Sequence, residues 1–420
     1  MKNHSLIATL TSLRGNPRGC VYTEPLWGIP YHLYAPYVSI YMLALGLTDT
    51  QIGSIISISW GFQLALALFS GAVTDKLGRR LTTLIFDIIA WSVPALISAV
   101  AQNYWYFLAA GLVNSFWRIT HTSWSCLLVE DADKDQLVDI YSWIYIANLI
   151  VGFIAPLAGA LIAAFTLIPT VRGLYVFAAV IFTLKAVVTY LMTEETQQGL
   201  IRMQATRHQS IFHVLGEYRG IVQAVLRTPQ TLYTAGIMLI LSISNVITGN
   251  FWGIIATERL HIPAENLAYF PFIKSAVTLV FFFFVMPRVS KLHFKIPMSL
   301  GFLGYVASQA LLILAPEQSY LLLGLSVFME ALCFAAVAPL VDKLFVLTVD
   351  AKERARIQSI LQVGIILVTS PFGWIAGTLS GIDKTLPFAL NMALFAVGAV
   401  LAFIAGNASQ KDPPAETVSP

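Results

Sequence analysis

The chain has 420 residues, of which 57% are hydrophobic and only 11% are charged. Soluble domains carry about 25% charged residues, so this chain has more apolar surface than a globular core can hide, and the excess must face lipid. The net charge of +3 is too small to indicate a nucleic-acid partner.

Twelve apolar runs are each long enough to cross a bilayer as a helix, which takes about 20 residues. We expect an all-α membrane protein and not a barrel, because each run is too uniformly apolar for alternating strands. The predicted spans are residues 26–45, 50–70, 81–101, 104–129, 137–165, 171–193, 231–256, 266–286, 297–315, 319–341, 357–381 and 386–405.

Lys and Arg residues are distributed unevenly between the two sides of these spans. With the N-terminus inside the cell, cytoplasmic segments hold 19 of the 25 Lys and Arg residues and external loops hold three. Positive charge is enriched in the cytoplasmic loops of membrane proteins. We therefore expect both termini in the cytoplasm and a multi-pass protein of the cell (cytoplasmic) membrane.

A polar stretch at residues 194–230 divides the chain into halves of similar length, and its later part has the apolar spacing of an interfacial helix. The halves share faint repeats: Asp133 and Ser142 before the fifth span match Asp350 and Ser359 before the eleventh. A duplication of six spans predicts two pseudo-symmetric six-helix bundles. The expected parts are a first bundle at 1–193, a linker at 194–230, a second bundle at 231–406 and a tail at 407–420.

Residues 71–80 form a polar hinge between the second and third spans, with the sequence Gly-Ala-Val-Thr-Asp-Lys-Leu-Gly-Arg-Arg. The pattern G-x-x-x-D-(R/K)-x-G-R-(R/K) resembles the signature between spans 2 and 3 of the major facilitator superfamily. The resemblance implies two bundles that rock about a central site, alternately open to each side, with spans 1, 4, 7 and 10 lining the cavity. The gating residues it implies in this hinge are Gly71, Asp75, Gly78, Arg79 and Arg80.

Two contacts are expected to give the hinge its gating role. Asp75 is predicted to accept backbone N–H groups at a helix N-terminus, that of span 11. Arg79 or Arg80 is predicted to reach Glu130 or its acidic neighbours at the end of span 4. The alternative is that the cations of the hinge only fix the orientation in the membrane.

Span 5 contains Ala155-Pro156-Leu157-Ala158-Gly159-Ala160. This is similar to the G-P-x-x-G-G signature in span 5 of drug–proton antiporters, with alanine in place of its first and last glycine. Pro156 and Gly159 are therefore assigned a gating role, because small residues and proline let helices approach closely and bend.

Charged residues inside the spans are the strongest functional signal, since each costs about 2.5–3.5 kcal/mol at mid-bilayer and needs a partner, water or a function. Counting along the spans places Arg118, Lys274 and Glu330 near the middle. We expect Glu330 to carry a proton, and Arg118 and Lys274 to bind an anionic group of the substrate or to set the protonation of Glu330. An equally supported interpretation is a fixed ion pair between Glu330 and Lys274 that joins spans 8 and 10.

Span 4 carries further polar residues at helical spacing. Asn114, Arg118, His121 and Ser125 are predicted to share one narrow face, which cannot face lipid. We favour a water-filled cavity in which Asn114, Arg118 and His121 bind substrate. The alternative is a packing network around one buried arginine.

Aromatic residues line one side of span 1 within about 120° of arc. They are Trp27, Tyr31, Tyr34, Tyr37 and Tyr41. We expect Tyr34 and Tyr37, with Asn245 and Trp252 of span 7, to bind substrate, because aromatic rings offer flat apolar contact and hydroxyl donors. For Trp27 and Tyr41 ordinary packing at the membrane interface is at least as well supported.

The sequence has no nucleophile–base arrangement, metal-spaced cysteine pair or phosphate-binding loop, so we expect neither an enzyme nor a cofactor. The favoured function is secondary active transport by a monomer in the lipid bilayer: proton-coupled efflux of small organic or amphipathic compounds. Uptake or exchange of an organic anion or sugar is the alternative. A lipid flippase and a non-transporting membrane protein rank below both.

Overall fold

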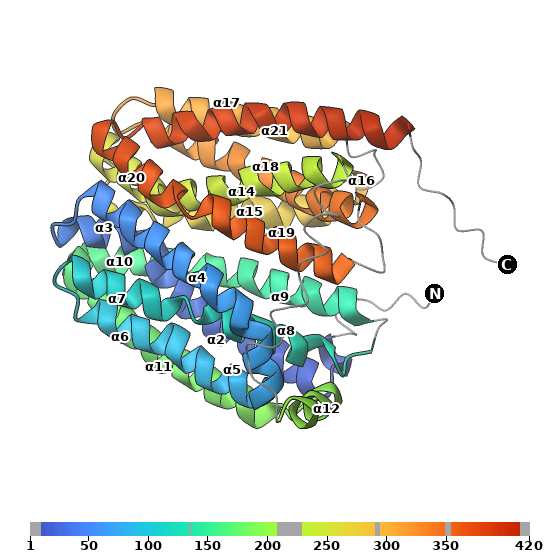
Figure 1. Ribbon diagram of the computed structural model, residues 1–420. Helices are drawn as coiled ribbons and strands as arrows, with labels where there is room; N and C mark the ends of the chain where they lie inside the picture. Colours follow the sequence, from blue (N-terminus) through green and yellow to red (C-terminus); the bar gives the residue numbers. More distant parts are fainter. Residues whose placement is uncertain (1–9, 134–135, 208–228, 290–294, 349–353, 412–420) are drawn as a thin grey trace. The chain divides into compact units, whose positions relative to one another are not determined.

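The computed structural model describes residues 10–133, 136–207, 229–289, 295–348 and 354–411. Within these residues the secondary structure is helical and includes no strand (Figure 1). The elements are α2 (Gly15–Tyr34), η1 (Ala35–Tyr37), α3 (Val38–Ala44), α4 (Asp49–Leu77), α5 (Arg79–Asp87), η2 (Ile88–Ser92), α6 (Val93–Ala99), α7 (Tyr104–Asn114), α8 (Trp117–Val129), α9 (Leu137–Val151), η4 (Gly152–Ile154), α10 (Ala155–Phe165), α11 (Leu167–Met192), α12 (Gln197–Thr206), α14 (Pro229–Ile254), η6 (Ile255–Arg259), η7 (Ala264–Asn266), α15 (Tyr269–Phe284), α16 (Met286–Val289), α17 (Lys295–Leu314), α18 (Tyr320–Thr348), α19 (Arg354–Thr369), α20 (Phe372–Ile382) and α21 (Leu386–Lys411).

Ten helical segments of the described residues are long and apolar enough to cross a membrane. Each of them overlaps a predicted span, which confirms the all-helical membrane class. Large apolar side chains stay exposed on these segments, for example Leu321 at 82% and Ile382 at 74%, as expected for a surface in contact with lipid. The number of twelve spans and the side on which the termini lie remain predictions, and the predicted interfacial helix falls mainly on 208–228, outside the described residues.

The two predicted spans that are not among the ten are both interrupted helices. The first span is built from α2, η1 and α3, and Pro36 lies in the 3₁₀ turn between the two helices. Proline cannot donate a backbone hydrogen bond, so a helix is readily broken there. The fourth span is built from α7 and α8, which are separated at Ser115 and Phe116.

The boundaries of α4 follow from local chemistry. Thr48 and Gln51 form a reciprocal capping box at its start, which satisfies two backbone N–H groups. The helix ends at Gly78, whose φ of 85° is a conformation that side chains with a Cβ rarely adopt. The sharp turn at Gly78 lets the chain reverse into α5.

The chain folds as two compact units. The first comprises Met1–Gly216 and Pro263–Phe272, and the second comprises Glu217–Ile262 and Ile273–Pro420. In the first unit α2 packs against α9 and α11, and α8 packs against α4 and α5.

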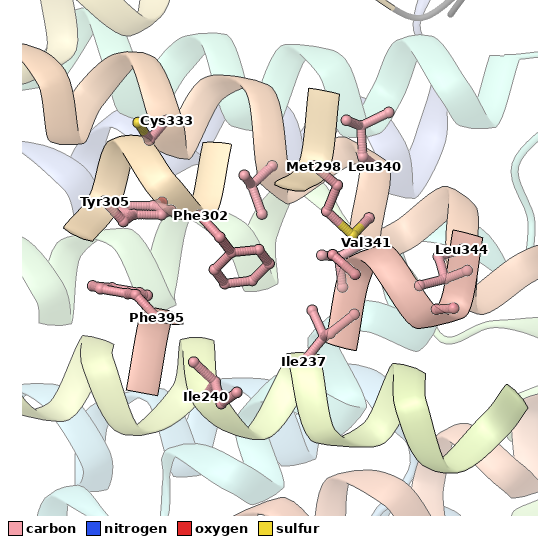
Figure 2. Packing of buried hydrophobic residues seen from close by; sticks show 13 residues of the cluster. Ile237, Ile240, Met298, Phe302, Tyr305, Cys333, Leu340, Val341, Leu344 and Phe395 are labelled. Atoms are coloured by element: carbon pink, nitrogen blue, oxygen red, sulfur yellow. The ribbon is translucent and has the colours of Figure 1, made fainter. Parts of the chain in front are cut away.

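In the second unit α17 lies beside α18 and α21 (Figure 1). Figure 2 shows the apolar cluster that these helices share with α14. The rings of Tyr305 and Phe395 stack there with centroids 4.5 Å apart. Gly398 faces the fully buried Phe302, because a Cβ on this glycine would lie 2.7 Å from Phe302 Cε1. Small residues allow such close helix packing in membranes.

The packing of α17 on α21 predicts that Gly398→Ala destabilises the protein. The added methyl group has no room beside Phe302, and overpacking of this kind costs about 1–3 kcal/mol. Thermal unfolding in detergent should show a lower melting temperature for this variant. Gly249→Ala is the matched control, because a Cβ at this position of α14 meets no atom within 4 Å. Equal melting temperatures for the two variants would contradict the predicted tight contact.

Candidate functional site

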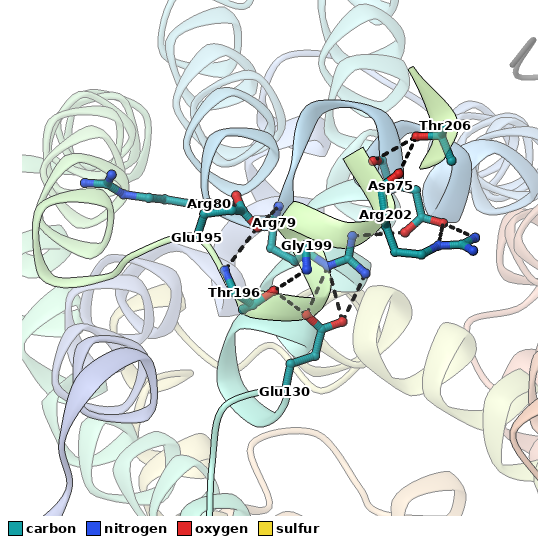
Figure 3. Close-up of polar contacts among 9 residues, drawn as sticks. All are labelled: Asp75, Arg79, Arg80, Glu130, Glu195, Thr196, Gly199, Arg202 and Thr206. Carbon is teal, nitrogen blue, oxygen red and sulfur yellow. Dashed lines mark hydrogen bonds and ion pairs between the residues drawn. The ribbon is translucent and has the colours of Figure 1, made fainter. Parts of the chain in front are cut away.

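The hinge between α4 and α5 is held by a network of charged side chains. Arg79 forms an ion pair with Asp75 at 3.0 Å and another with Glu130 at 3.0 Å. Its Nε also donates to both Glu130 oxygens, at 3.2 and 3.1 Å (Figure 3). The predicted contact between Arg79 and Glu130 is thereby confirmed. A planar guanidinium suits such multiple hydrogen bonds to carboxylates better than an ammonium does.

Glu195 caps the start of α5. The backbone N–H groups of Arg79 and Arg80 donate to its two carboxylate oxygens at 2.8 and 3.0 Å. A carboxylate at a helix N-terminus satisfies free N–H groups and interacts favourably with the helix dipole. A Cβ on Gly78 would lie 2.5 Å from Glu195 Oε2, so glycine is required here both for its φ and for this cap.

The short helix α12 completes the network. Arg202 donates to Asp75 Oδ2 from Nε at 2.9 Å and from Nη2 at 2.6 Å. Thr196 donates to Glu130 at 2.5 Å, and Thr206 donates to the Asp75 carbonyl at 3.2 Å. We call Asp75, Arg79, Glu130, Glu195 and Arg202 the hinge network. It joins the segment after α11 to the turn between α4 and α5 (Figure 3).

The other predicted gating residues of the hinge have different environments. Arg80 does not bind Glu130 but donates to the Tyr190 carbonyl at 3.0 and 2.8 Å and lies over the Tyr190 ring. Gly71 has open space where a Cβ would be. The predicted contact between Asp75 and span 11 involves the start of α19, next to residues 349–353 outside the described part of the chain, and stays a prediction.

The residues of span 4 bind different neighbours. Arg118 donates from Nε to Gln63 of α4 at 3.1 Å and lies 4.1 Å from the Trp117 ring. Asn114 donates to the Ala90 carbonyl at 2.8 Å, and His121 packs edge-on against Trp117. Asn114 thus has a different partner from Arg118 and His121, and the shared face of the three residues stays a prediction.

The aromatic residues of span 1 pack within the first unit. Tyr34 lies against Tyr175 of α11, with ring centroids 4.7 Å apart. Tyr37 and Tyr41 are fully buried, and the Tyr41 hydroxyl donates to the Ser98 carbonyl at 3.0 Å. Trp27 stacks on Tyr31 at 4.7 Å. Ordinary aromatic packing therefore accounts for Tyr41 and Trp27, as the alternative interpretation holds. The Tyr37 hydroxyl is buried and has no hydrogen-bond partner among the described residues, and the binding role of Tyr34 and Tyr37 stays a prediction.

Span 5 is interrupted next to Pro156, the proline of its small-residue motif. The 3₁₀ turn η4 separates α9 from α10, and Pro156 occupies the first turn of α10. Gly159 faces the backbone carbonyl of Glu265 so closely that a Cβ would collide with it. Gly159 thus serves close packing, as predicted, and the gating role of Pro156 and Gly159 stays a prediction.

In the second unit Lys274 and Glu330 form an ion pair with Nζ 2.6 Å from Oε1. The lysine side chain is 40% exposed and the glutamate side chain 12% exposed. The structure thus shows the ion pair of the second interpretation, which joins α15 to α18. Asn245 is exposed and Trp252 is partly buried on α14, and the role of both in binding stays a prediction.

A model of the Major Facilitator Superfamily matches residues 28–297, which is more than half of the chain. This chain belongs to the major facilitator superfamily. The Multidrug resistance protein MdtG of Rahnella sp. is 23% identical over 402 residues, which cover 92% of this chain and 90% of that protein. MdtG of Yersinia enterocolitica is 24% identical over 353 residues, covering 81% of this chain and 80% of the relative.

Solved structures of the superfamily share the fold. The nucleoside transporter NupG aligns with a TM-score of 0.68 at 15% identity and covers 94% of this chain and 99% of its own. A POT family transporter bound to a thioalcohol-conjugated peptide aligns with a TM-score of 0.69 at 16% identity, covering 96% of this chain and 99% of its own. These similarities and the apolar helices identify a multi-pass integral membrane transporter.

Sequence reasoning missed one buried carboxylate, Glu24, which is 8% exposed. It precedes the predicted span 26–45 and was not counted among the charges in the membrane. The observed helix α2 begins at Gly15 and so includes Glu24. The predicted span began after Pro25, but α2 continues through this proline towards the N-terminus. A first helix predicted to begin before Pro25 would have placed Glu24 within it.

The hinge network predicts that α12 is held in place by Arg202. In Arg202→Ala the Asp75 carboxylate loses its partner on α12, so the amides of α12 should exchange with deuterium several-fold faster. Hydrogen exchange followed by mass spectrometry measures this directly. Arg207→Ala is the control, since Arg207 is an exposed residue at the end of the same helix. Unchanged exchange in Arg202→Ala would contradict the prediction, because the hydrogen bonds of Thr196 and Thr206 would then be enough to hold α12 in place.

Proposed function

We propose that the protein is a secondary active transporter that works by alternating access and exports small organic or amphipathic compounds against an inward proton gradient. Membership in the superfamily and the MdtG relatives support transport of this class. The observation that carries the proposal is the placement of ionisable groups within the spans. Such groups are expensive in a membrane and are retained mainly for function.

Arg118 is the proposed substrate-binding cation. Its one hydrogen-bonding side-chain partner in the described chain is Gln63, which is neutral. No carboxylate of the described residues forms an ion pair with it, whereas Arg79, Lys185, Arg202 and Lys274 all have one. A partly buried guanidinium without a counter-ion favours an anionic or strongly polar group of a ligand.

Glu330 is the proposed proton carrier. Its ion pair with Lys274 is stable while the carboxylate is ionised, and a proton on Glu330 would break it. The Lys274 ammonium, which is partly exposed, would then be free to bind another anion. Proton binding and the link between α15 and α18 are coupled in this scheme.

A second candidate function is exchange or uptake of an organic anion. The uncompensated charge of Arg118 favours it specifically. The two functions differ in the charge of the compound carried and in the need for a proton gradient.

The proton-carrier role predicts that Glu330→Gln abolishes transport driven by a pH gradient. Glutamine is close in shape to a protonated glutamate and cannot release a proton, so substrate binding should persist. The measurement is efflux of an anionic fluorescent dye from proteoliposomes with an imposed pH gradient, together with binding of the same dye to the purified protein. Efflux at the wild-type rate in Glu330→Gln would exclude Glu330 as the carrier.

The binding role of Arg118 predicts a charge-selective effect of Gln63→Glu. The new carboxylate would lie beside Arg118 and compete with anionic ligands, while helix packing is preserved. Binding of anionic dyes should weaken at least ten-fold, and binding of neutral dyes should change little. Thr122→Val, which removes a hydroxyl bonded only to the Arg118 carbonyl, serves as the control. Equal weakening for both classes of dye would contradict the assignment.

A further inference from the structure

The first unit buries three charged side chains from three helices in one place. Glu24 of α2 is 8% exposed, Asp87 of α5 is 3% exposed and Lys185 of α11 is 5% exposed. Lys185 Nζ lies 2.6 Å from Asp87 Oδ2. The second oxygen of Asp87 accepts a hydrogen bond from the Thr120 hydroxyl at 2.9 Å. The ion pair between Lys185 and Asp87 is therefore satisfied on its own.

Glu24 is the additional charge of this cluster. Asn148 of α9 donates to its Oε1 at 3.0 Å, and the carboxylate lies within electrostatic reach of both Lys185 and Asp87. Lys185 forms its ion pair with Asp87 and not with Glu24, so the cluster carries one excess negative charge when all three groups are ionised. A buried charge without a counter-ion costs several kcal/mol, and the usual response of such a group is to bind a proton.

Among the described residues, no cation on the helices packed around α2 forms an ion pair with Glu24; Arg172 of α11 donates to the Tyr41 hydroxyl and the Ala101 carbonyl. From α2 itself Cys20 faces Glu24, from α11 Lys185 and from α5 Asp87. The cations of α8 and of the start of α5 bind elsewhere, Arg118 to Gln63 and Arg79 to the hinge network. The remaining titratable groups on the elements that pack against α2 are Tyr37 of η1, Asp139, Tyr141 and Tyr145 of α9, His121 and Cys126 of α8, and Arg172, Tyr175 and Tyr190 of α11.

We propose that Glu24, together with Lys185 and Asp87, forms a proton-binding site of the first unit, separate from Glu330. With a proton on Glu24 the cluster is neutral and Lys185 stays with Asp87. Without the proton, Lys185 is shared between the two carboxylates. The role of the site in transport rests on the proton coupling proposed above, but the binding of the proton does not.

The position of the cluster links proton binding to the packing of three helices. Asp87 is the ninth residue of α5 and Lys185 lies seven residues before the end of α11. At about 1.5 Å of rise per residue, Asp87 lies roughly 12 Å from the start of α5 and Lys185 roughly 10 Å from the end of α11. A shift of Lys185 from Asp87 towards Glu24 weakens the link between α11 and α5 and strengthens the link between α11 and α2. The proton thus selects which helix pair is joined by charge.

Infrared difference spectroscopy of the purified protein in lipid, recorded between acid and alkaline pH, tests the site without any substrate. The wild type should show the carbonyl band of a protonated carboxylic acid that disappears as the pH rises. Glu330→Gln should remove only the component of Glu330, which binds a proton in the scheme proposed above. Glu24→Gln should remove the component of Glu24. Asp87→Asn should weaken it, because Lys185 then pairs with Glu24 alone. Lys185→Met should strengthen it, because neither carboxylate then has a cation.

Retention of the full band in Glu24→Gln would overturn the proposal, and so would a band that Lys185→Met leaves unchanged. Melting temperatures give a second measure if the Asp87 and Lys185 variants fail to fold. Glutamine at position 24 removes the excess charge, so Glu24→Gln should become more stable relative to the wild type as the pH rises. A difference between the two proteins that is the same at every pH would also overturn the proposal.

The same variants separate this proposal from the proposed function. If the band depends on Glu24 but efflux is insensitive to pH gradients, the proton site stands and proton-driven efflux fails. If efflux is proton-driven but Glu24→Gln retains both the band and the efflux rate, the function stands and this site fails.

Discussion

The cost of charge in a low-dielectric medium is the constraint on which the rest of this structure depends. Three ion pairs in the described part of the chain join segments that are far apart in sequence: Lys185 with Asp87, Glu330 with Lys274, and Arg79 with Glu130. Each pair joins two helices that apolar packing alone does not orient, since lipid and apolar side chains are alike. The charges therefore specify which helices meet and which residues along each helix lie opposite one another.

The hinge network shows the same constraint near the helix ends. The two arginines of this turn are strongly bound: Arg79 to two carboxylates, and Arg80 to a carbonyl and an aromatic ring. The acidic groups come from α4, from the end of α8 and from the segment before α12. One short signature thus organises three parts of the first unit. Its glycine at position 78 is required because Glu195 occupies the space next to it.

The three proposed sites differ in their charge. Arg118 is an unpaired cation, Lys274 with Glu330 is neutral, and Glu24 with Asp87 and Lys185 has one excess negative charge. An unpaired cation favours an anionic ligand, a neutral pair opens when its acid is protonated, and an excess carboxylate takes up a proton. The charge state of each site therefore decides the chemistry that we assign to it.

The sequence by itself determined the membrane class and the family, because run length, composition and a ten-residue signature are local properties. It predicted that Arg79 or Arg80 reaches the acidic residues at the end of span 4, and only the structure selected Arg79 and Glu130. The sequence also identified Arg118, Lys274 and Glu330, since a charge within an apolar run is visible without a structure. Only the tertiary structure decided that Glu195 caps α5 from 116 residues away, and that Arg202 binds Asp75 from 127 residues away. Likewise the different partners of Asn114 and Arg118 depend on packing. So does the burial of Glu24 in the unit that also buries the pair of Lys185 and Asp87, 98 residues apart. Periodicity along one helix cannot reveal these contacts, because which side chains of distant segments meet depends on how all the helices pack together.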